Sequence, residues 1–203
     1  MGLFYKTACF GLYALFKLFY RHEIIYTTTA AYITTGAIIA PNHLSFLDPP
    51  VIASSWHKEA YFFARATLFH NPLFARLIRA LHAYPLQPSS SRALKDAEML
   101  LKEGKQIVIF PEGTHSFDGV LQPLKKGVAL LALRTNCPII PAYIRGTDRC
   151  WPKGHRFPRF FGERTSCTFG APIFPSAFAH LEPKEAQEAI IQELHKALIQ
   201  LQG

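Results

Sequence analysis

The stretch Ala37-Ile-Ile-Ala-Pro-Asn-His-Leu-Ser-Phe-Leu-Asp-Pro-Pro50 indicates both the fold and the candidate site. Its first four residues are apolar and predict a buried strand, whereas Pro49 and Pro50 end the strand and suit a helix start. Between the strand and the helix lie an imidazole, His43, and a carboxylate, Asp48. A carboxylate can fix the tautomer of a histidine and stabilise its charged form, so this pair is a candidate general base with its orienting group.

The same residues also fit an ordinary turn. Asp48 before Pro49 suits the N-cap of a helix, where a side-chain oxygen accepts hydrogen bonds from backbone N–H groups. His43 could be a loop histidine whose hydrogen bonds are satisfied within the fold. Ser45 lies between them, but it is outside a Gly-x-Ser-x-Gly turn and is a poor candidate nucleophile. On this stretch alone both interpretations stay open.

Strand-like and helix-like segments alternate along the rest of the chain. The alternation predicts one α/β layered domain, residues 23–203, with a mixed, largely buried sheet flanked by helices. Pro138 and Pro141 favour a place at or near a sheet edge for the strand Cys137–Ile144, because proline cannot complete a ladder. The other expected strands are 23–32, 36–40, 60–64, 84–86, 106–110 and 165–169. The expected helices are 50–56, 72–80, 92–103, 125–134 and one that begins at Pro183.

Composition bears on the partners of the protein. The chain of 203 residues has a formal net charge of +8 and 17 phenylalanines, yet only 18% of its residues are charged. A basic and aromatic surface suits an anionic membrane, whereas nucleic acid would account for the charge alone and no nucleic-acid-binding motif occurs. We therefore expect anionic phospholipid as a partner, and no nucleic acid.

Residues 1–22 are nearly all apolar, with Lys6 and Lys17 as interruptions. The uncharged span between the lysines is shorter than the ~20 residues that cross a bilayer, and no signal-peptide cleavage site follows. The pattern predicts an amphipathic interfacial helix whose lysines reach lipid phosphates. Such a helix would hold the protein at the cell membrane, as a peripheral or monotopic protein of the cytoplasmic face. The alternative is a helix packed on the domain's own core.

A second polar loop, Phe110-Pro-Glu-Gly-Thr-His-Ser116, follows the expected strand 106–110, where α/β sheets place ligand sites. Gly113 lets the backbone approach a ligand closely, and Thr114 offers a hydroxyl group. Glu112 could hold a basic side chain or a ligand hydroxyl. The alternative is an ordinary turn, but two polar loops after two strands of one sheet favour a site.

Cations near these loops are candidate phosphate ligands. Arg65 follows the expected strand 60–64, and Lys126 lies at the start of an expected helix. Cations and helix N-termini both suit a phosphate group. The alternative for any single one of them is a solvated surface charge.

Four blocks of the sequence together resemble the glycerolipid acyltransferases, the family that includes bacterial 1-acylglycerol-3-phosphate acyltransferase. Pro41-Asn-His-Leu-Ser-Phe-Leu-Asp-Pro49 is similar to the family's His-x-x-x-x-Asp block, and Phe110-Pro-Glu-Gly-Thr114 to its Phe-Pro-Glu-Gly-Thr block. Residues 63–74 resemble the second block, in which a basic residue follows a strand. Ile139-Ile-Pro141 resembles the fourth, apolar block. The similarity covers residues 36 to about 172, with the order and spacing of the blocks preserved.

Two positions depart from the family pattern. The family commonly has arginine after Glu-Gly-Thr, where this chain has His115. It also tends to have an arginine shortly after the strand that matches Tyr84–Leu86, where this chain has Gln87-Pro-Ser89. Both family arginines are associated with the substrate phosphate. Other cations would have to replace them here, or the acceptor has a different polar head.

The resemblance implies an enzyme that moves an acyl group from acyl-CoA or acyl carrier protein to the sn-2 hydroxyl of a lysophospholipid, 1-acylglycerol 3-phosphate. It makes His43 the general base and Asp48 its orienting group, with no metal and no other cofactor. The implied substrate-binding residues are Asn42, Ser45, Arg65, Glu112, Gly113, Thr114, His115 and Lys126. Glycerol 3-phosphate or another lysolipid is the alternative acceptor. A thioester or lipid hydrolase and a non-catalytic lipid-binding protein are the alternatives from other functional classes.

Overall fold

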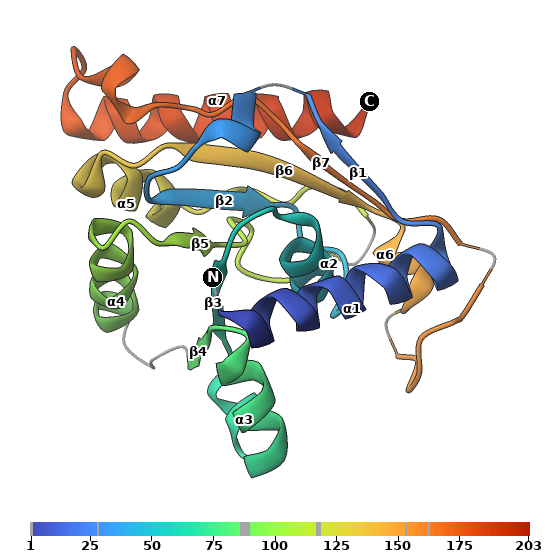
Figure 1. Ribbon diagram of the computed structural model, residues 1–203. Helices are drawn as coiled ribbons and strands as arrows, with labels where there is room; N and C mark the ends of the chain where they lie inside the picture. The colour runs from blue at the N-terminus through green and yellow to red at the C-terminus, as the bar shows by residue number, and fades with distance from the viewer. Residues whose placement is uncertain (1, 28, 86–89, 117–118, 153, 162) are drawn as a thin grey trace.

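The structure, a computed structural model, describes residues 2–27, 29–85, 90–116, 119–152, 154–161 and 163–203. Its centre is a seven-stranded sheet in the order β1-β7-β6-β2-β5-β3-β4 (Figure 1). The strands are β1 (Glu23–Tyr26), β2 (Ala37–Pro41), β3 (Ala60–Ala64), β4 (Ala83–Pro85), β5 (Gln106–Val108), β6 (Ile139–Arg145) and β7 (Ser166–Phe169). The helices are α1 (Leu3–Tyr20), α2 (Asp48–Ser55), α3 (Pro72–Ala80), α4 (Ser90–Lys102), α5 (Gly127–Thr135), α6 (Thr147–Cys150) and α7 (Pro183–Gln202). Short 3-10 helices are η1 (Thr29–Tyr32), η2 (Ala66–Phe69) and η3 (Pro175–Phe178).

The sheet is mixed, as the sequence predicts. Strands β6 and β7 pair antiparallel, whereas β2 pairs parallel with both β5 and β6, and β3 pairs parallel with β5. Because these four parallel strands run in one direction, their carboxyl ends meet at one edge of the sheet. The segments that follow them therefore lie close together, as expected for a ligand site in an α/β fold.

Alternate residues of β2 face opposite sides of the sheet, which explains its apolar sequence. Ala37 and Ile39 belong to the core on the side of α1 and α2. Ile38 and Ala40 belong to the core on the side of α4, α5 and α7. All four are fully buried, as a strand covered on both faces requires (Figure 1).

The expectation that the strand Cys137–Ile144 lies at or near an edge is wrong. The observed strand β6 is central, between β7 and β2. Pro141 fits there because its ladder with β7 begins only at the next residue, Ala142, so no β7 carbonyl faces the missing N–H. The carbonyl of Pro141 accepts a hydrogen bond from Gly170 N at 2.8 Å, just beyond the end of β7.

Helix α1 packs one face on the core and leaves the other exposed. Tyr5, Cys9, Phe16 and Tyr20 are buried against the α2 side of the sheet. The opposite face carries exposed apolar side chains: Leu3, Phe4, Phe10, Leu15 and Leu18. Of the helices in the described part of the chain, none is both long and apolar enough to span a membrane.

Candidate active site

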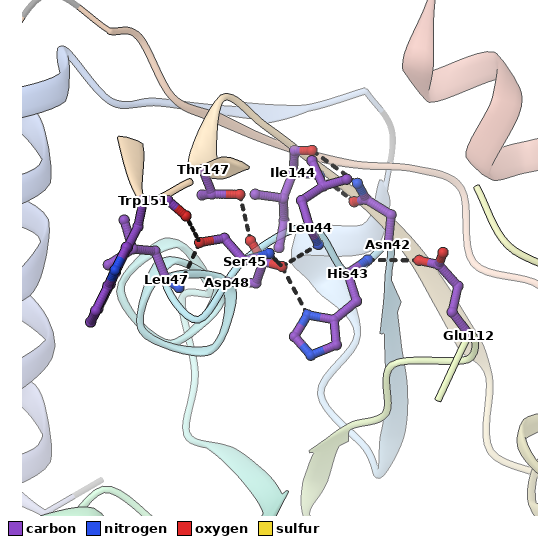
Figure 2. Close-up of polar contacts among 10 residues, drawn as sticks. All are labelled: Asn42, His43, Leu44, Ser45, Leu47, Asp48, Glu112, Ile144, Thr147 and Trp151. Carbon is purple, nitrogen blue, oxygen red and sulfur yellow. Dashed lines mark hydrogen bonds and ion pairs between the residues drawn. The ribbon is translucent and has the colours of Figure 1, made fainter. Parts of the chain in front are cut away.

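His43 and Asp48 form a direct pair at the carboxyl edge of the sheet (Figure 2). His43 Nδ1 lies 2.8 Å from Asp48 Oδ2. Since an ionised carboxylate only accepts hydrogen bonds, Nδ1 carries the proton and Nε2 is left with its lone pair. Among the described residues, none hydrogen-bonds to Nε2. The histidine side chain is 14% exposed and that of the aspartate is fully buried.

Asp48 is held by four donors. Oδ2 also accepts hydrogen bonds from the backbone N–H groups of Leu44 at 2.6 Å and Ser45 at 2.8 Å. Oδ1 accepts a hydrogen bond from the hydroxyl of Thr147 at 2.5 Å. A buried carboxylate with this number of donors has its hydrogen-bonding capacity satisfied and is fixed in position. The side chain therefore orients His43 instead of capping α2, whose first N–H groups receive no side-chain hydrogen bond.

The imidazole of His43 lies between two rings. Phe110 stacks on it with a centroid distance of 3.8 Å and an interplanar angle of 21°. His115 meets it edge to face at 3.9 Å, and the ring of His115 also contacts Phe46 at 4.8 Å. These contacts leave the His43 ring few rotamers, so Nε2 points in one direction before any substrate binds.

Glu112 joins the two polar loops. Its Oε1 accepts a hydrogen bond from His43 N at 2.7 Å, and its Oε2 accepts one from Gln122 N at 2.8 Å. Burial raises the pKa of the Glu112 carboxyl, and the two backbone donors partly offset that rise. The sequence suggested that Glu112 holds a basic side chain or a ligand hydroxyl; in the structure its two oxygens hold backbone amides.

Asn42 and Ser45 are buried and make contacts within the fold. Asn42 exchanges two hydrogen bonds with the backbone of Ile144: Nδ2 donates to the carbonyl at 3.0 Å, and Oδ1 accepts from the N–H at 2.6 Å. The Ser45 hydroxyl donates to the carbonyl of Trp151 at 3.4 Å. Asn42 thus joins the end of β2 to the end of β6, and both residues support the loop that carries His43.

Gly113 has a backbone conformation that only glycine adopts easily, with φ of 73°. A Cβ atom there would lie 2.5 Å from the Nζ atom of Lys125, so the side chain of Lys125 lies directly over this glycine. The N–H of Gly113 donates to the carbonyl of Phe110 at 3.1 Å. The ammonium group of Lys125 therefore lies against the loop that carries Glu112 and Gly113.

The other predicted residues, Arg65, Thr114 and Lys126, are exposed. Lys126 forms an exposed ion pair with Glu188 of α7 at 2.7 Å. Arg65 is exposed at the carboxyl end of β3, one strand beyond β5. Thr114 is exposed on the Glu112 loop. Residues 87–89, the second departure from the family pattern, lie outside the described residues.

Sequence reasoning missed Thr147 as part of the site, and it quoted Phe110 in the second loop without giving it a role. Thr147 follows the carboxyl end of β6, which runs parallel to β2, so the edge that carries His43 also carries Thr147. The placement of β6 near a sheet edge hid this relationship. Phe110 was assigned to the expected strand 106–110, but β5 ends at Val108, so Phe110 belongs to the loop and reaches His43.

Comparison with known proteins tests the family. Residues 21–145, more than half of the chain, match the sequence model of the family described as Acyltransferase. The chain belongs to the acyltransferase family. The match includes His43, Asp48 and the Glu112 loop, and it ends just before Thr147. The acyltransferase fold and the recognised family are thus both confirmed.

Individual acyltransferases agree with this assignment. The 1-acyl-sn-glycerol-3-phosphate acyltransferase of Bacillus subtilis is 28% identical over 177 residues, which cover 83% of this chain and 82% of that protein. The chloroplastic enzyme of the same name from Brassica napus is 31% identical over 140 residues, or 67% of this chain; this match spans only 40% of that relative's length. The crystal structure of the 1-acyl-sn-glycerophosphate acyltransferase PlsC from Thermotoga maritima superposes with a TM-score of 0.71 at 25% identity, over 97% of this chain and 81% of that one.

Proposed function

We propose that the protein transfers a fatty acyl group from an acyl thioester, of CoA or of acyl carrier protein, to the sn-2 hydroxyl of 1-acylglycerol 3-phosphate, giving phosphatidic acid. The observation that carries the proposal is the His43–Asp48 pair, with Nδ1 bound to a buried carboxylate and Nε2 without a hydrogen-bond partner in the part of the chain that the structure describes. The names of the B. subtilis, B. napus and T. maritima relatives support the choice of acceptor.

In this mechanism His43 Nε2 takes the proton of the acceptor hydroxyl as the oxygen attacks the thioester carbonyl. Asp48 stabilises the imidazolium that forms, as a carboxylate does in the serine-hydrolase triad. The C–S bond then breaks, an ester C–O bond remains, and the departing thiolate takes the proton back from His43. The acceptor oxygen plays the part of the serine, so no protein nucleophile is required.

Lys125 is the cation best placed to bind the acceptor phosphate. Its ammonium group lies over Gly113, in the loop that is joined to the backbone of His43 through Glu112. A lysine binds phosphate as a compact charge, which suits a position beside a glycine where the ligand can come close. Lys126, one residue on, is paired with Glu188 and is the weaker candidate.

The test is an assay of the purified full chain with labelled acyl-CoA and acyl carrier protein donors against a panel of acceptors, read by mass spectrometry. We expect phosphatidic acid from 1-acylglycerol 3-phosphate, and its loss in His43→Ala. Faster acylation of glycerol 3-phosphate or another lysolipid would replace the proposed acceptor. Free fatty acid without any acceptor would identify a hydrolase, and near-normal transfer by His43→Ala would refute the mechanism.

We also propose that α1 lies in the membrane interface through its exposed apolar face. Leu3 is 79% exposed, Phe10 73% and Leu18 67%, and Lys6 and Lys17 flank this face. Because Tyr5 and Phe16 of the same helix belong to the core, deletion of α1 would also damage the fold. The better test is Leu3→Ser with Phe10→Ser and Leu18→Ser in the full chain. Weaker binding to anionic vesicles at unchanged stability is expected, and unchanged binding would contradict the proposal.

A further inference from the structure

Helix α3 has its apolar side directed away from the protein. Its exposed residues include Leu73 at 82%, Leu77 at 46% and Phe74 at 44%, whereas Ala75 alone is buried. At 100° per residue the three large side chains span about 100° of the helix surface, and Ala75 lies on the opposite side. An amphipathic helix of a soluble domain normally places its apolar stripe on the core. In α3 this orientation is reversed.

The segment around α3 is strongly basic. From Arg65 to His82 the chain contains three arginines and no aspartate or glutamate. Arg76 and Arg79 lie on α3 and are exposed, and within the described residues neither forms an ion pair. Arg79 lies over the ring of Phe69 in η2, with 5.4 Å between the guanidinium carbon and the ring centroid. An outward apolar stripe on a helix whose other sides carry arginines complements a surface that is apolar inside and anionic outside.

The arrangement joins α3 to α1. His82, directly after α3, lies between two rings: Tyr5 of α1 at 4.8 Å and Tyr61 of β3 at 4.5 Å, each with an interplanar angle of 11°. The three stacked rings fix the end of α3 to the first turns of α1. Figure 1 shows α3 extending away from the sheet, beyond the N-terminal end of α1. The C-terminal end of α3 therefore lies next to the N-terminal part of α1 (Figure 1).

We infer that α3 is a second membrane-docking element, which inserts Leu73, Phe74 and Leu77 among the acyl chains of an anionic bilayer. Arg76 and Arg79 would then lie at the level of the lipid phosphates, as basic residues do beside an interfacial helix. We choose a bilayer as the partner of this stripe for two reasons. Helix α3 projects from the sheet (Figure 1), and the charged residues around it are all basic. The inference depends only on this surface and holds whether or not the acceptor is 1-acylglycerol 3-phosphate.

The first test compares two triple variants of the full chain in sedimentation with vesicles of phosphatidylcholine and phosphatidylglycerol in equal parts. One variant is Leu73→Ser with Phe74→Ser and Leu77→Ser. The matched control is Met99→Ser with Phe174→Ser and Ile199→Ser, which removes three similarly exposed apolar side chains from other elements. We expect the α3 variant to bind at least about tenfold more weakly than the wild type and the control to bind normally. Equal binding by both variants would overturn the inference.

A second test does not depend on the folding of a triple variant. Leu73→Trp places a reporter at the most exposed of the three apolar positions, and Met99→Trp is its control on α4. Brominated phospholipid should quench the added fluorescence of the first variant and leave that of the second. If Leu73→Trp is not quenched while the chain is bound to vesicles, α3 does not enter the bilayer.

The charge and the occupant can be tested separately. Arg76→Gln with Arg79→Gln should weaken binding to the mixed vesicles and have little effect on pure phosphatidylcholine vesicles, because only the former carry anionic headgroups. Sedimentation velocity without lipid shows whether another copy of the chain covers α3. Self-association that disappears in the Leu73, Phe74 and Leu77 variant would identify that copy as the occupant and overturn the inference.

Discussion

The hydroxyl of Thr147 donates a 2.5 Å hydrogen bond to Oδ1 of Asp48, across 99 residues of sequence. The other three donors to this carboxylate come from residues 43–45, on the same loop. Among the described residues, Thr147 is therefore the one whose hydrogen bond ties the carboxylate to the segment after β6. It lies 0% exposed, so no water replaces the hydroxyl if it is removed.

Thr147→Val should leave Oδ1 of Asp48 buried and unpaired. The cost is about 1–3 kcal/mol of folding stability, as for other buried acceptors that lose a donor. We also expect kcat to fall several-fold, with a shifted pH–rate profile, because a carboxylate with one donor fewer pairs differently with the imidazole. Thr147→Ser keeps the hydroxyl and should restore most of both. The role of Thr147 would be disproved if the valine and serine variants had the same pH profile.

Two neighbouring lysines should differ in their effect on substrate binding. Lys125→Met should raise the KM for an acceptor with a phosphate by about tenfold or more with a smaller change in kcat, since it removes a charge from the ground state and transition state alike. Lys126→Met should have a much smaller effect, because Lys126 pairs with Glu188 on the surface. Steady-state kinetics with varied acceptor checks this. The reverse order would move the phosphate contact to Lys126.

Glu112→Gln should loosen the connection between the two loops. Both oxygens of Glu112 accept from backbone N–H groups, whereas an amide has one acceptor and would direct its NH₂ group at a second donor. We expect about 1–3 kcal/mol less stability and a lower kcat, because the backbone of His43 is held less firmly. Urea unfolding and kinetics measure the two effects. The control, Glu188→Gln, removes an exposed partner of Lys126 and should leave both quantities unchanged; a stable, fully active Glu112→Gln would contradict the prediction.

His22 should make the protein sensitive to acid. It is fully buried, with Nδ1 2.9 Å from Thr165 Oγ1 and Nε2 2.8 Å from Ser55 Oγ. Burial lowers the pKa of His22 from 6.5 to about 4. Between these two pH values this histidine is protonated in the unfolded chain and neutral in the folded protein. The stabilisation is present above pH 6.5 and is lost as the pH falls toward 4, by roughly 3 kcal/mol at most.

Urea unfolding over this pH range measures the loss. In His22→Gln the same range should show a shallower dependence on pH, whatever the absolute stability of the variant, because glutamine does not titrate. An identical slope for the wild type and the variant would show that other groups cause the acid sensitivity.

The pair at the centre of the site could be predicted from sequence because its two residues lie on one short loop between a strand and a helix. The connection of that loop to residue 112 and the contact with Thr147 depend on which strands are neighbours. The prolines of β6 wrongly predicted a strand at or near the sheet edge, whereas β6 pairs with β2. The missing N–H of Pro141 costs nothing where the β6–β7 ladder has not yet begun, a detail of register that no local pattern contains.

Side-chain direction also limited what the sequence could show. Lys125 and Lys126 are adjacent and chemically identical, yet one lies over Gly113 and the other on the surface beside α7. The periodicity of residues 72–80 predicts the helix correctly but not the direction of its apolar stripe. That direction depends on Ala75, which is small enough to let the helix pack closely through its other side.

Asn42, immediately before His43, is bound to the backbone of Ile144. Glu112 accepts a hydrogen bond from the amide nitrogen of His43 itself. The backbone beneath the imidazole is therefore ordered when the domain folds, and substrate binding need not immobilise it. In the proposed acyl transfer, the entropy that is lost on binding then falls mainly on the two substrates themselves. The loop should show the same hydrogen-exchange protection at residue 43 with and without ligand.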